Sequence, residues 1–157
     1  MWLSGREFKN IAFETGWSKS SIAEDIPHVL RAIIEGLDDE VQWPNEEQRH
    51  VLATQFDGIF SNCIGIIDGW ECQINKSKNK EKATYSGKKK NNTKKVLAVI
   101  DYRGYFIFAR TDIDGRYNDR TVFVESDLYL RRGEYVSPGR WLAADGIFEG
   151  DGSCGVS

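Results

Sequence analysis

The chain has 157 residues, 40% of them hydrophobic and 12% aromatic, with a formal net charge of −3. This length accommodates one ordinary domain, or a small domain beside part of a larger one, and the apolar content excludes general disorder. Three cysteines without a CxxC pair exclude a zinc knuckle and a disulfide framework, and no apolar run approaches the ~18 residues of a membrane span.

Charge is unevenly distributed along the chain. Residues 1–62 contain 11 acidic and 5 basic side chains, a net charge of −6, whereas residues 76–95 contain nine lysines and a single acid, Glu81. A basic segment of this kind is commonly a solvated loop. It also suits a phosphate-rich partner, because lysines neutralise phosphates.

Two short apolar patterns near the N-terminus predict a pair of helices. Their apolar positions are Phe8, Ile11, Ala12, Ile22 and Ile26. Gly16 permits a turn between them, and Ser18 is positioned to cap the second helix. With the small Ala12 at the helix crossing, this spacing is typical of a helix-turn-helix over residues 6–26.

This segment has two interpretations. A DNA reader would present Lys19 and Ser20 at the start of its second helix. A plain helical hairpin is the alternative, since the surroundings are acidic and Pro27 breaks or kinks a helix. Asp25 would then cap a fresh helix from about Ile26, whose apolar stripe we expect to lie in a core. The stripe consists of Val29, Leu30, Ile33, Ile34 and Leu37.

A further helix is predicted after Trp43-Pro44. Asn45 and Gln48 have the spacing of a capping box, which marks the start of that helix. Its inward-facing positions are expected to be Val51, Leu52, Phe56, Ile59 and Phe60.

Residues 63–69 predict a buried strand that Asp68 ends. A carboxylate at the end of such a strand costs free energy unless it is paired, hydrogen-bonded or bound to a cation. Gly69 lets the chain turn away sharply. Asp68 is therefore either a site residue or the cap of a turn, because Asp-Gly is also a hairpin signal.

The next elements are a hairpin and a helix. Residues 96–102 predict a strand, and Arg103-Gly104 predicts a tight turn into another strand over residues 105–110. Residues 121–130 then predict a helix. Asp119 precedes this helix, and its simplest role is that of N-cap.

A second Asp-Gly pair ends the apolar run Trp141–Ala144 at Asp145. Two such strands can lie in one sheet with Asp68 and Asp145 at the same end. Two carboxylates about a strand spacing apart repel each other unless a cation lies between them, and Mg²⁺ prefers hard oxygen ligands. With the basic segment nearby, the substrate would be a phosphodiester cleaved by an in-line water that a bound ion activates.

Several blocks of the sequence resemble, in order, those of the DDE endonuclease domain of PIF/Harbinger-type transposases. The blocks are Ile64–Gly69, Tyr85–Lys90, Gly115–Asp119, Ser126–Tyr129 and Leu142–Gly146. The resemblance covers nearly the whole chain, and the ordered set is its specific feature. The upstream helix-turn-helix pattern is similar to that family as well.

The resemblance implies an α/β fold with a helical N-terminal region, residues 1–60, that includes the helix-turn-helix. A partial RNase H-like domain would follow over residues 61–149, with a mixed sheet and flanking helices, and residues 150–157 would be a disordered tail. The site implied by the resemblance combines metal-binding and catalytic acids with a divalent ion, Mg²⁺ or Mn²⁺. Its acids are Asp68 and Asp145, the first two members of the metal-binding triad, and Asp119, a further catalytic acid.

The resemblance also implies a DNA partner. Residues expected near DNA are Tyr85, Lys88, Lys89 and Lys90, in addition to Lys19 and Ser20 of the helix-turn-helix. The family commonly requires a separate DNA-binding partner protein and acts in the nucleus, without a membrane, and a homo-oligomer is compatible with it.

The sequence departs from the family at several positions. Asn118 and Asn92 stand where the family usually has histidine, and the third acid is a glutamate expected beyond Ser157. Glu149 is too close to Asp145 to replace it. We therefore interpret the chain as a C-terminally truncated transposase or derived nuclease with little or no cleavage activity. The alternatives are a non-catalytic DNA-binding or scaffold protein and a non-functional remnant.

Overall fold

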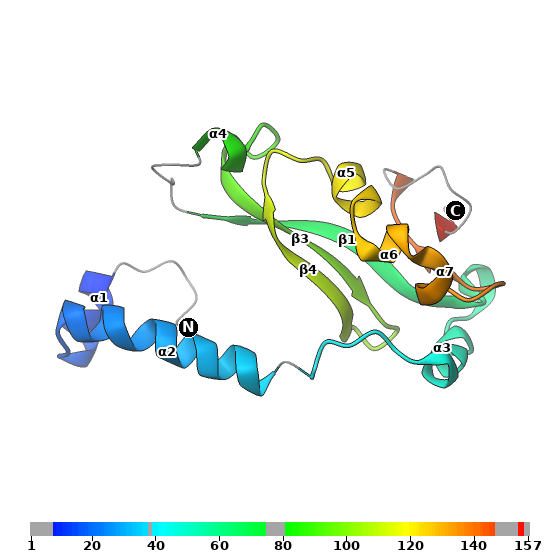
Figure 1. Cartoon of the computed structure of the whole chain (residues 1–157), viewed down its shortest axis with the longest axis horizontal. Helices are drawn as coiled ribbons and strands as arrows, with labels where there is room; N and C mark the ends of the chain where they lie inside the picture. The colour runs from blue at the N-terminus through cyan, green and yellow to red at the C-terminus, as the bar shows by residue number, and fades with distance from the viewer. Residues whose placement is uncertain (1–7, 38, 75–80, 147–153, 156–157) are drawn as a thin grey trace. The chain divides into compact units, whose positions relative to one another are not determined.

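The computed structural model describes residues 8–37, 39–74, 81–146 and 154–155 (Figure 1). The chain forms two compact units, residues 1–40 and residues 41–157. The sequence-based boundary at residue 60 groups the segment after Trp43 with the N-terminal helices, whereas in the structure this segment belongs to the second unit.

The first unit contains a hairpin of two helices, α1 (Phe8–Thr15) and α2 (Lys19–Gly36). Gly16 makes the turn with a φ of +74°, and the Ser18 side chain caps α2 by accepting a hydrogen bond from the Ser21 backbone N–H. Ile11 and Ile22 are the buried residues of the two helices. The predicted helix pair is therefore present, and its role as a DNA reader stays a prediction.

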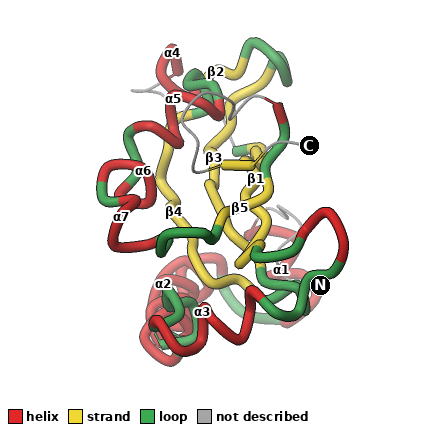
Figure 2. Tube along the Cα trace, turned by 90° about the vertical axis from the view of Figure 1, so that its right-hand side faces the viewer, coloured by secondary structure: helices red, strands yellow, loops and turns green. Residues whose placement is uncertain are grey.

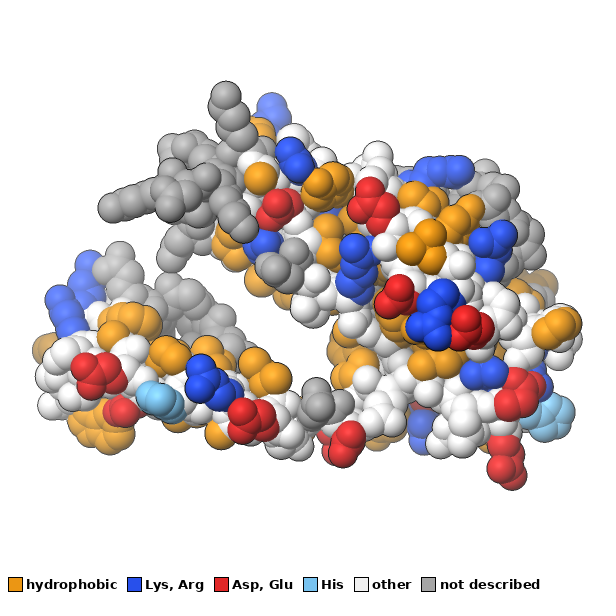
Figure 3. Space-filling model, viewed as in Figure 1, with side chains coloured by type: hydrophobic (Ala, Val, Ile, Leu, Met, Phe, Trp, Pro, Cys, Tyr) orange, Lys and Arg blue, Asp and Glu red, His pale blue; other side chains and the backbone are white. Residues whose placement is uncertain are grey.

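Helix α2 runs without a break through Pro27, so the prediction of a fresh helix at Asp25 was wrong. A proline removes one amide donor, and the helix-forming sequence on both sides of it maintains the helical path. The apolar stripe of α2 also differs from expectation, because its five side chains are 45–67% exposed and not in a core. Hydrophobic side chains are visible along this helix in Figure 3.

The second unit contains a mixed sheet, which has six strands among the described residues. The strands are β1 (Cys63–Gln73), β2 (Tyr85–Ser86), β3 (Asn91–Ile100), β4 (Phe106–Asp114), β5 (Trp141–Ala143) and β6 (Cys154–Gly155). Strand β3 pairs antiparallel with β1, β2 and β4, while β5 pairs parallel with β1 and β6. The hairpin predicted at Arg103-Gly104 is confirmed as the connection of β3 to β4.

Strands occupy more of the chain than predicted. The basic segment is a loop only in part, because β3 begins at Asn91 and includes Lys94 and Lys95. Both lysines are neutralised by ion pairs with neighbouring elements, which lets them occupy a strand. Cys154 and Gly155 of the expected tail form β6, and the rest of residues 150–157 lies outside the described residues.

Short helices pack on the sheet of the second unit (Figure 2). They are α3 (Glu46–Ala53), the 3₁₀ helix η1 (Gly58–Phe60), α4 (Glu81–Thr84), α5 (Asp119–Val124), α6 (Asp127–Leu130) and α7 (Arg132–Tyr135). The helix predicted over residues 121–130 is thus two helices that meet at Ser126, whose hydroxyl donates to the Phe123 carbonyl. Its predicted N-cap was also wrong, since Asn118 accepts the Thr121 N–H and Asp119 is the first helical residue.

Helix α3 begins as the sequence predicts. The Asn45 side chain accepts from the Gln48 N–H, and the Gln48 side chain accepts from the Asn45 N–H, each at 2.9 Å. Leu52 is buried, but Val51 is 53% and Ile59 75% exposed, so these two inward positions were wrong. Helix α3 ends at Ala53, and the turn before η1 breaks the helical spacing on which the prediction depended.

The two faces of the central strands differ. Ile67, Leu97 and Val99 are at most 1% exposed and belong to one core with side chains from α5 and α6. We call this the covered face. Because side chains alternate along a strand, Ile66 and Trp70 project from the opposite face, where they are 38% and 63% exposed. We call this second face the open face.

The architecture is α/β, with three antiparallel strands, a set of short helices and a strand parallel to β1. It is consistent with the partial RNase H-like domain that the sequence predicts. None of the helices in the described part of the chain is both long and apolar enough to cross a membrane.

Candidate active site

Asp68 lies within β1, opposite Ala98 of β3. Its side chain is exposed on the open face, and its Oδ1 accepts a hydrogen bond of 2.7 Å from the Gly69 backbone N–H. The prediction that Asp68 ends the strand was wrong, because pairing with β3 continues to Gln73. An exposed carboxylate avoids the cost of desolvation and is accessible to a cation.

Asp145 follows β5, the parallel neighbour of β1. The register pairs Ile66 with Ala143, the last residue of β5, and Asp145 follows Ala143 by two residues as Asp68 follows Ile66. Neighbouring strands are about 4.8 Å apart. The parallel pairing of β1 and β5 therefore agrees with the prediction that the two exposed acids follow neighbouring strands at the same end of the sheet.

Asp119 lies on the other side of the sheet. Gly69 belongs to the covered face of β1 and lies close to Asp119. A Cβ at Gly69 would be only 2.6 Å from Asp119 Oδ1. The same Oδ1 accepts a hydrogen bond of 2.7 Å from Lys95 Nζ. Asp119 is thus held by a cation of the protein itself, on the face opposite Asp68.

Lys95 joins Asp119 to a second acid. Its Nζ is also 3.0 Å from Glu71 Oε1, and the Lys95 and Glu71 side chains are only 4% and 7% exposed. Glu71 Oε2 accepts hydrogen bonds from Ser86 and Thr93 at 2.8 and 3.3 Å. We call the three charged residues Glu71, Lys95 and Asp119 the buried ion triad; it connects β1, β3 and α5.

The ionisation of the triad follows from these contacts. Burial by itself would raise the pKa of Glu71, but hydrogen bonds from Lys95 and Ser86 outweigh it, and the pKa lies below its ordinary value. Burial would likewise lower the pKa of Lys95, but the two carboxylates raise it. Glu71 and Lys95 therefore both stay charged at neutral pH.

The sequence analysis missed Glu71 and Lys95 as members of a cluster. A signal was present, because Glu71 follows Ile67 by four residues and so projects from the same strand face as that core residue. An acid on a buried face requires a partner. The alternation of side chains continues to Glu71 only if the strand extends past Asp68-Gly69, which the sequence predicts as the end of the strand.

The residues predicted to contact DNA lie in two regions. Lys88, Lys89 and Lys90 form an exposed turn between β2 and β3, preceded by Tyr85, which is 47% exposed. In the first unit, the exposed Lys19 and Ser20 begin α2, and the Ser20 hydroxyl is 2.8 Å from that of Ser18. Lys76, Lys78 and Lys80 of the basic segment lie outside the described residues.

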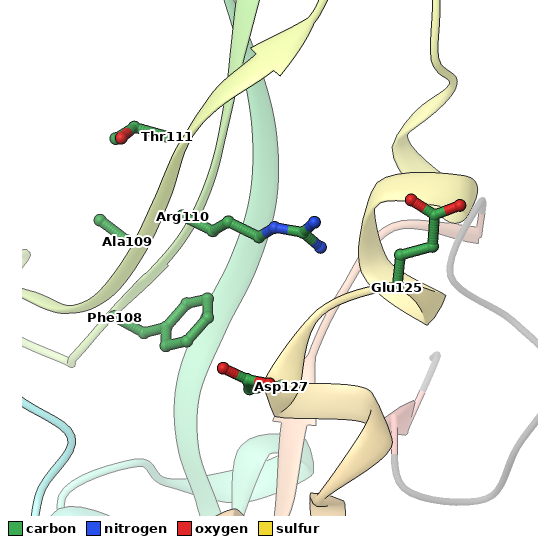
Figure 4. A pocket seen from close by; sticks show the side chains of 6 residues that line it. All are labelled: Phe108, Ala109, Arg110, Thr111, Glu125 and Asp127. Atoms are coloured by element: carbon green, nitrogen blue, oxygen red, sulfur yellow. The ribbon is translucent and has the colours of Figure 1, made fainter.

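A polar hollow of about 410 Å³ borders β4 and the α5–α6 junction. Its lining residues are Phe108, Ala109, Arg110, Thr111, Glu125 and Asp127. Figure 4 shows Arg110 directed from β4 toward α5, where its Nη1 donates to the Val122 carbonyl at 3.2 Å. Arg110 pairs with Leu97 of the covered face, so this hollow lies on the opposite side of the sheet from Asp68.

A divalent ion on the open face would need hard oxygen ligands. No group of three His, Cys, Asp or Glu side chains suited to a metal occurs within residues 8–37, 39–74, 81–146 and 154–155. Mg²⁺ often binds through only one or two carboxylates and keeps several waters. Asp68 and Asp145 supply the carboxylate oxygens that this mode of binding uses, and Asp119 forms an ion pair with Lys95.

Comparison with known proteins adds independent evidence. Residues 67–157 match the family described as DDE superfamily endonuclease, a segment that includes Asp68, Asp119 and Asp145. The chain is also similar to HARBI1 of Xenopus laevis, whose name describes a nuclease, with 25% identity over 136 residues. That similarity covers 85% of this chain and 39% of the relative. No solved structure matches the chain significantly.

Proposed function

The chain belongs to the DDE superfamily endonuclease family, and we propose that it is a transposase-derived nuclease of Harbinger type that acts on DNA phosphodiester bonds. The observation that supports this most is the parallel pairing of β1 with β5, in which Asp68 and Asp145 each follow the paired residues Ile66 and Ala143 by two positions. The exposed basic turn Lys88–Lys90 supports a polyanionic substrate. The nucleus, which the family resemblance implies, is the proposed site of action.

In this proposal Asp68 and Asp145 hold Mg²⁺ or Mn²⁺ on the open face. The ion, when bound, activates water for in-line attack and stabilises the leaving oxygen. Asp119 acts as a positioning residue, because Lys95 holds its carboxylate against Gly69 on the covered face. Two carboxylates hold an ion less firmly than three, so we expect weak metal binding and slow cleavage by this chain.

Titration with Mn²⁺ tests the site directly. In an NMR spectrum of the uniformly ¹⁵N-labelled chain, the paramagnetic ion should broaden amide signals around Asp68 and Asp145 first. Asp68→Asn and Asp145→Asn should each weaken binding at least about tenfold, because affinity follows the number of ligand charges. Asp57→Asn is the matched control, since Asp57 is exposed and makes no side-chain cap.

Nicking of supercoiled plasmid by the same variants tests the reaction. Mn²⁺-dependent nicking that Asp68→Asn abolishes and Asp57→Asn preserves would support the proposal. Selective broadening elsewhere on the chain, or equal Mn²⁺ affinity in Asp57→Asn and Asp68→Asn, would contradict it.

A non-catalytic DNA-binding or scaffold protein is the second candidate. It is favoured by the exposed turn Lys88–Lys90, which can bind phosphates without a metal. DNA binding that falls with salt and with Lys88→Glu and Lys89→Glu, but not with Asp68→Asn or chelation of metal, would favour this candidate if nicking were absent. Self-association and a separate DNA-binding partner protein stay predictions that no described contact tests.

A further inference from the structure

The open face carries an exposed tryptophan beside Asp68. Trp70 follows Asp68 by two residues on β1, so both side chains project from the same face. Trp70 is 63% exposed, and Ile66, two residues before Asp68, is 38% exposed. Exposed large apolar side chains that lie close together mark a contact surface, and these two flank the candidate metal ligand along β1.

Tyr85 reaches the same face from another strand. It lies opposite Asn92 of β3, and the next residue, Ser86, points to the covered face, where its hydroxyl donates to Glu71. Because successive residues of a strand point to opposite faces, Tyr85 points to the open face together with Trp70. The Tyr85 side chain is 47% exposed.

The two aromatic rings lie between the candidate metal site and the basic turn. Asp68 is level with Ala98 of β3, and Asn92, the partner of Tyr85, lies six residues earlier on that strand. At about 3.3 Å per residue this separation is about 20 Å, the length of a few nucleotides. The exposed turn Lys88–Lys90 immediately follows β2 at the far end.

We propose that Trp70 and Tyr85 stack on unpaired bases of a DNA strand whose phosphates extend from the Lys88–Lys90 turn to Asp68. This inference rests on the proposed function and specifies its substrate as single-stranded or frayed DNA. Aromatic rings interspersed with lysines are the arrangement by which proteins bind single strands, because every base offers a flat face. Paired bases in a duplex are already stacked on their neighbours and cannot use these rings.

The charge around the rings favours a nucleic acid over an apolar protein partner. The three positive charges of the Lys88–Lys90 turn would repel the same turn of a second copy of the chain, whereas they attract the phosphates of a nucleic acid strand. Lys94, on the same face between the two rings, forms an ion pair with Asp114 at 3.0 Å and adds no net charge of its own.

Fluorescence anisotropy with a labelled 12-nucleotide oligo-dT and a labelled 12-base-pair duplex tests the inference, with EDTA present so that no metal contributes. Trp70→Ala should weaken binding of the single strand by about 5- to 100-fold, the effect of removing one base-stacking ring, and should change duplex binding little. Trp70→Phe should recover most of the loss. Tyr105→Ala is the control, because Tyr105 is 64% exposed in the β3–β4 connection, at the other end of β3 from the basic turn.

Other outcomes would overturn the inference. They are a wild-type chain that does not bind oligo-dT, equal losses for the single strand and the duplex, and a Trp70→Ala variant that binds like wild type. Dissociation of a dimer by Trp70→Ala in sedimentation velocity would assign the face to a second copy instead. Because metal is absent throughout, failure here leaves the Mn²⁺ test of the proposed function unaffected, and failure of that test leaves this one interpretable.

Discussion

The covered and open faces of the same three strands use charge in opposite ways. On the covered face, Glu71 and Lys95 are almost fully buried and satisfy each other within the buried ion triad. On the open face, Asp68 stays in water beside the exposed Trp70. The charges of Glu71 and Lys95 are committed to the fold, whereas the charge of Asp68 is exposed to a ligand. Substitutions should therefore affect stability on one face and binding on the other.

The largest effect is expected at Lys95. Lys95→Met leaves the buried carboxylate of Glu71 and the half-buried carboxylate of Asp119 without their cation, which should lower the free energy of unfolding by about 3–5 kcal/mol. Urea denaturation followed by circular dichroism measures it. The control is Lys94→Met, because the Lys94–Asp114 pair is 27% and 22% exposed and such pairs contribute about 1 kcal/mol or less. Equal losses in both variants would remove the distinction between the faces.

Gly69→Ala should have the next largest effect. The new methyl group would lie 2.6 Å from Asp119 Oδ1, and moving that carboxylate strains the triad at a cost of about 1–3 kcal/mol. Gly87→Ala is the control, because no atom lies within 4 Å of a Cβ at Gly87. The same denaturation curves should show that Gly69→Ala costs less in an Asp119→Ala background. Additive losses would mean that the two residues do not interact.

Acid should weaken the covered face in a defined pH range. The pKa of Glu71 is lowered in the folded chain, so its contribution to stability is fully present above the ordinary value of 4.5 and is lost as the pH falls through the lowered pKa. Between pH 5 and 3 the unfolding free energy of wild type should therefore fall more steeply than that of Glu71→Gln. Urea denaturation at each pH measures both slopes.

The difference in slope between wild type and Glu71→Gln separates the effect of Glu71 from that of the other acids. Hydrogen bonds from Ser137 and Arg49 lower the pKa of Glu46 to about 2, but Glu46 is present in both chains and its effect cancels. Parallel slopes would show that the triad makes no ionisation-dependent contribution to folding.

Local signals in the sequence predict much of this fold. The capping box at Asn45 and Gln48 and the turn at Arg103-Gly104 depend on a few adjacent residues, and both are present as predicted. The order of strands also follows from apolar runs. These features need no knowledge of distant contacts, because backbone geometry and nearby side chains determine them.

Features that depend on distant partners were not predictable in this way. Asp68-Gly69 has the composition of a turn, but hydrogen bonding to β3 keeps it extended, and the same pairing turns Lys95 from a loop residue into a buried one. Asp119 was assigned to the candidate site from its resemblance to a family acid. Its contact with Lys95, 24 residues away, is a tertiary interaction that neither helix nor strand periodicity reveals.

The smallest effect on stability is expected on the open face, at Asp68. Asp68→Asn removes an exposed charge and should change the free energy of unfolding in EDTA by no more than about 0.5 kcal/mol. Added Mg²⁺ at ten times its Kd should stabilise wild type by about 1.4 kcal/mol, because an ion that binds only the folded chain shifts the equilibrium toward it. Asp68→Asn should lose this stabilisation, and Asp57→Asn should keep it. Thermal denaturation with and without Mg²⁺ measures all three chains, and a large loss of stability in EDTA for Asp68→Asn alone would show that the open face, too, is committed to the fold.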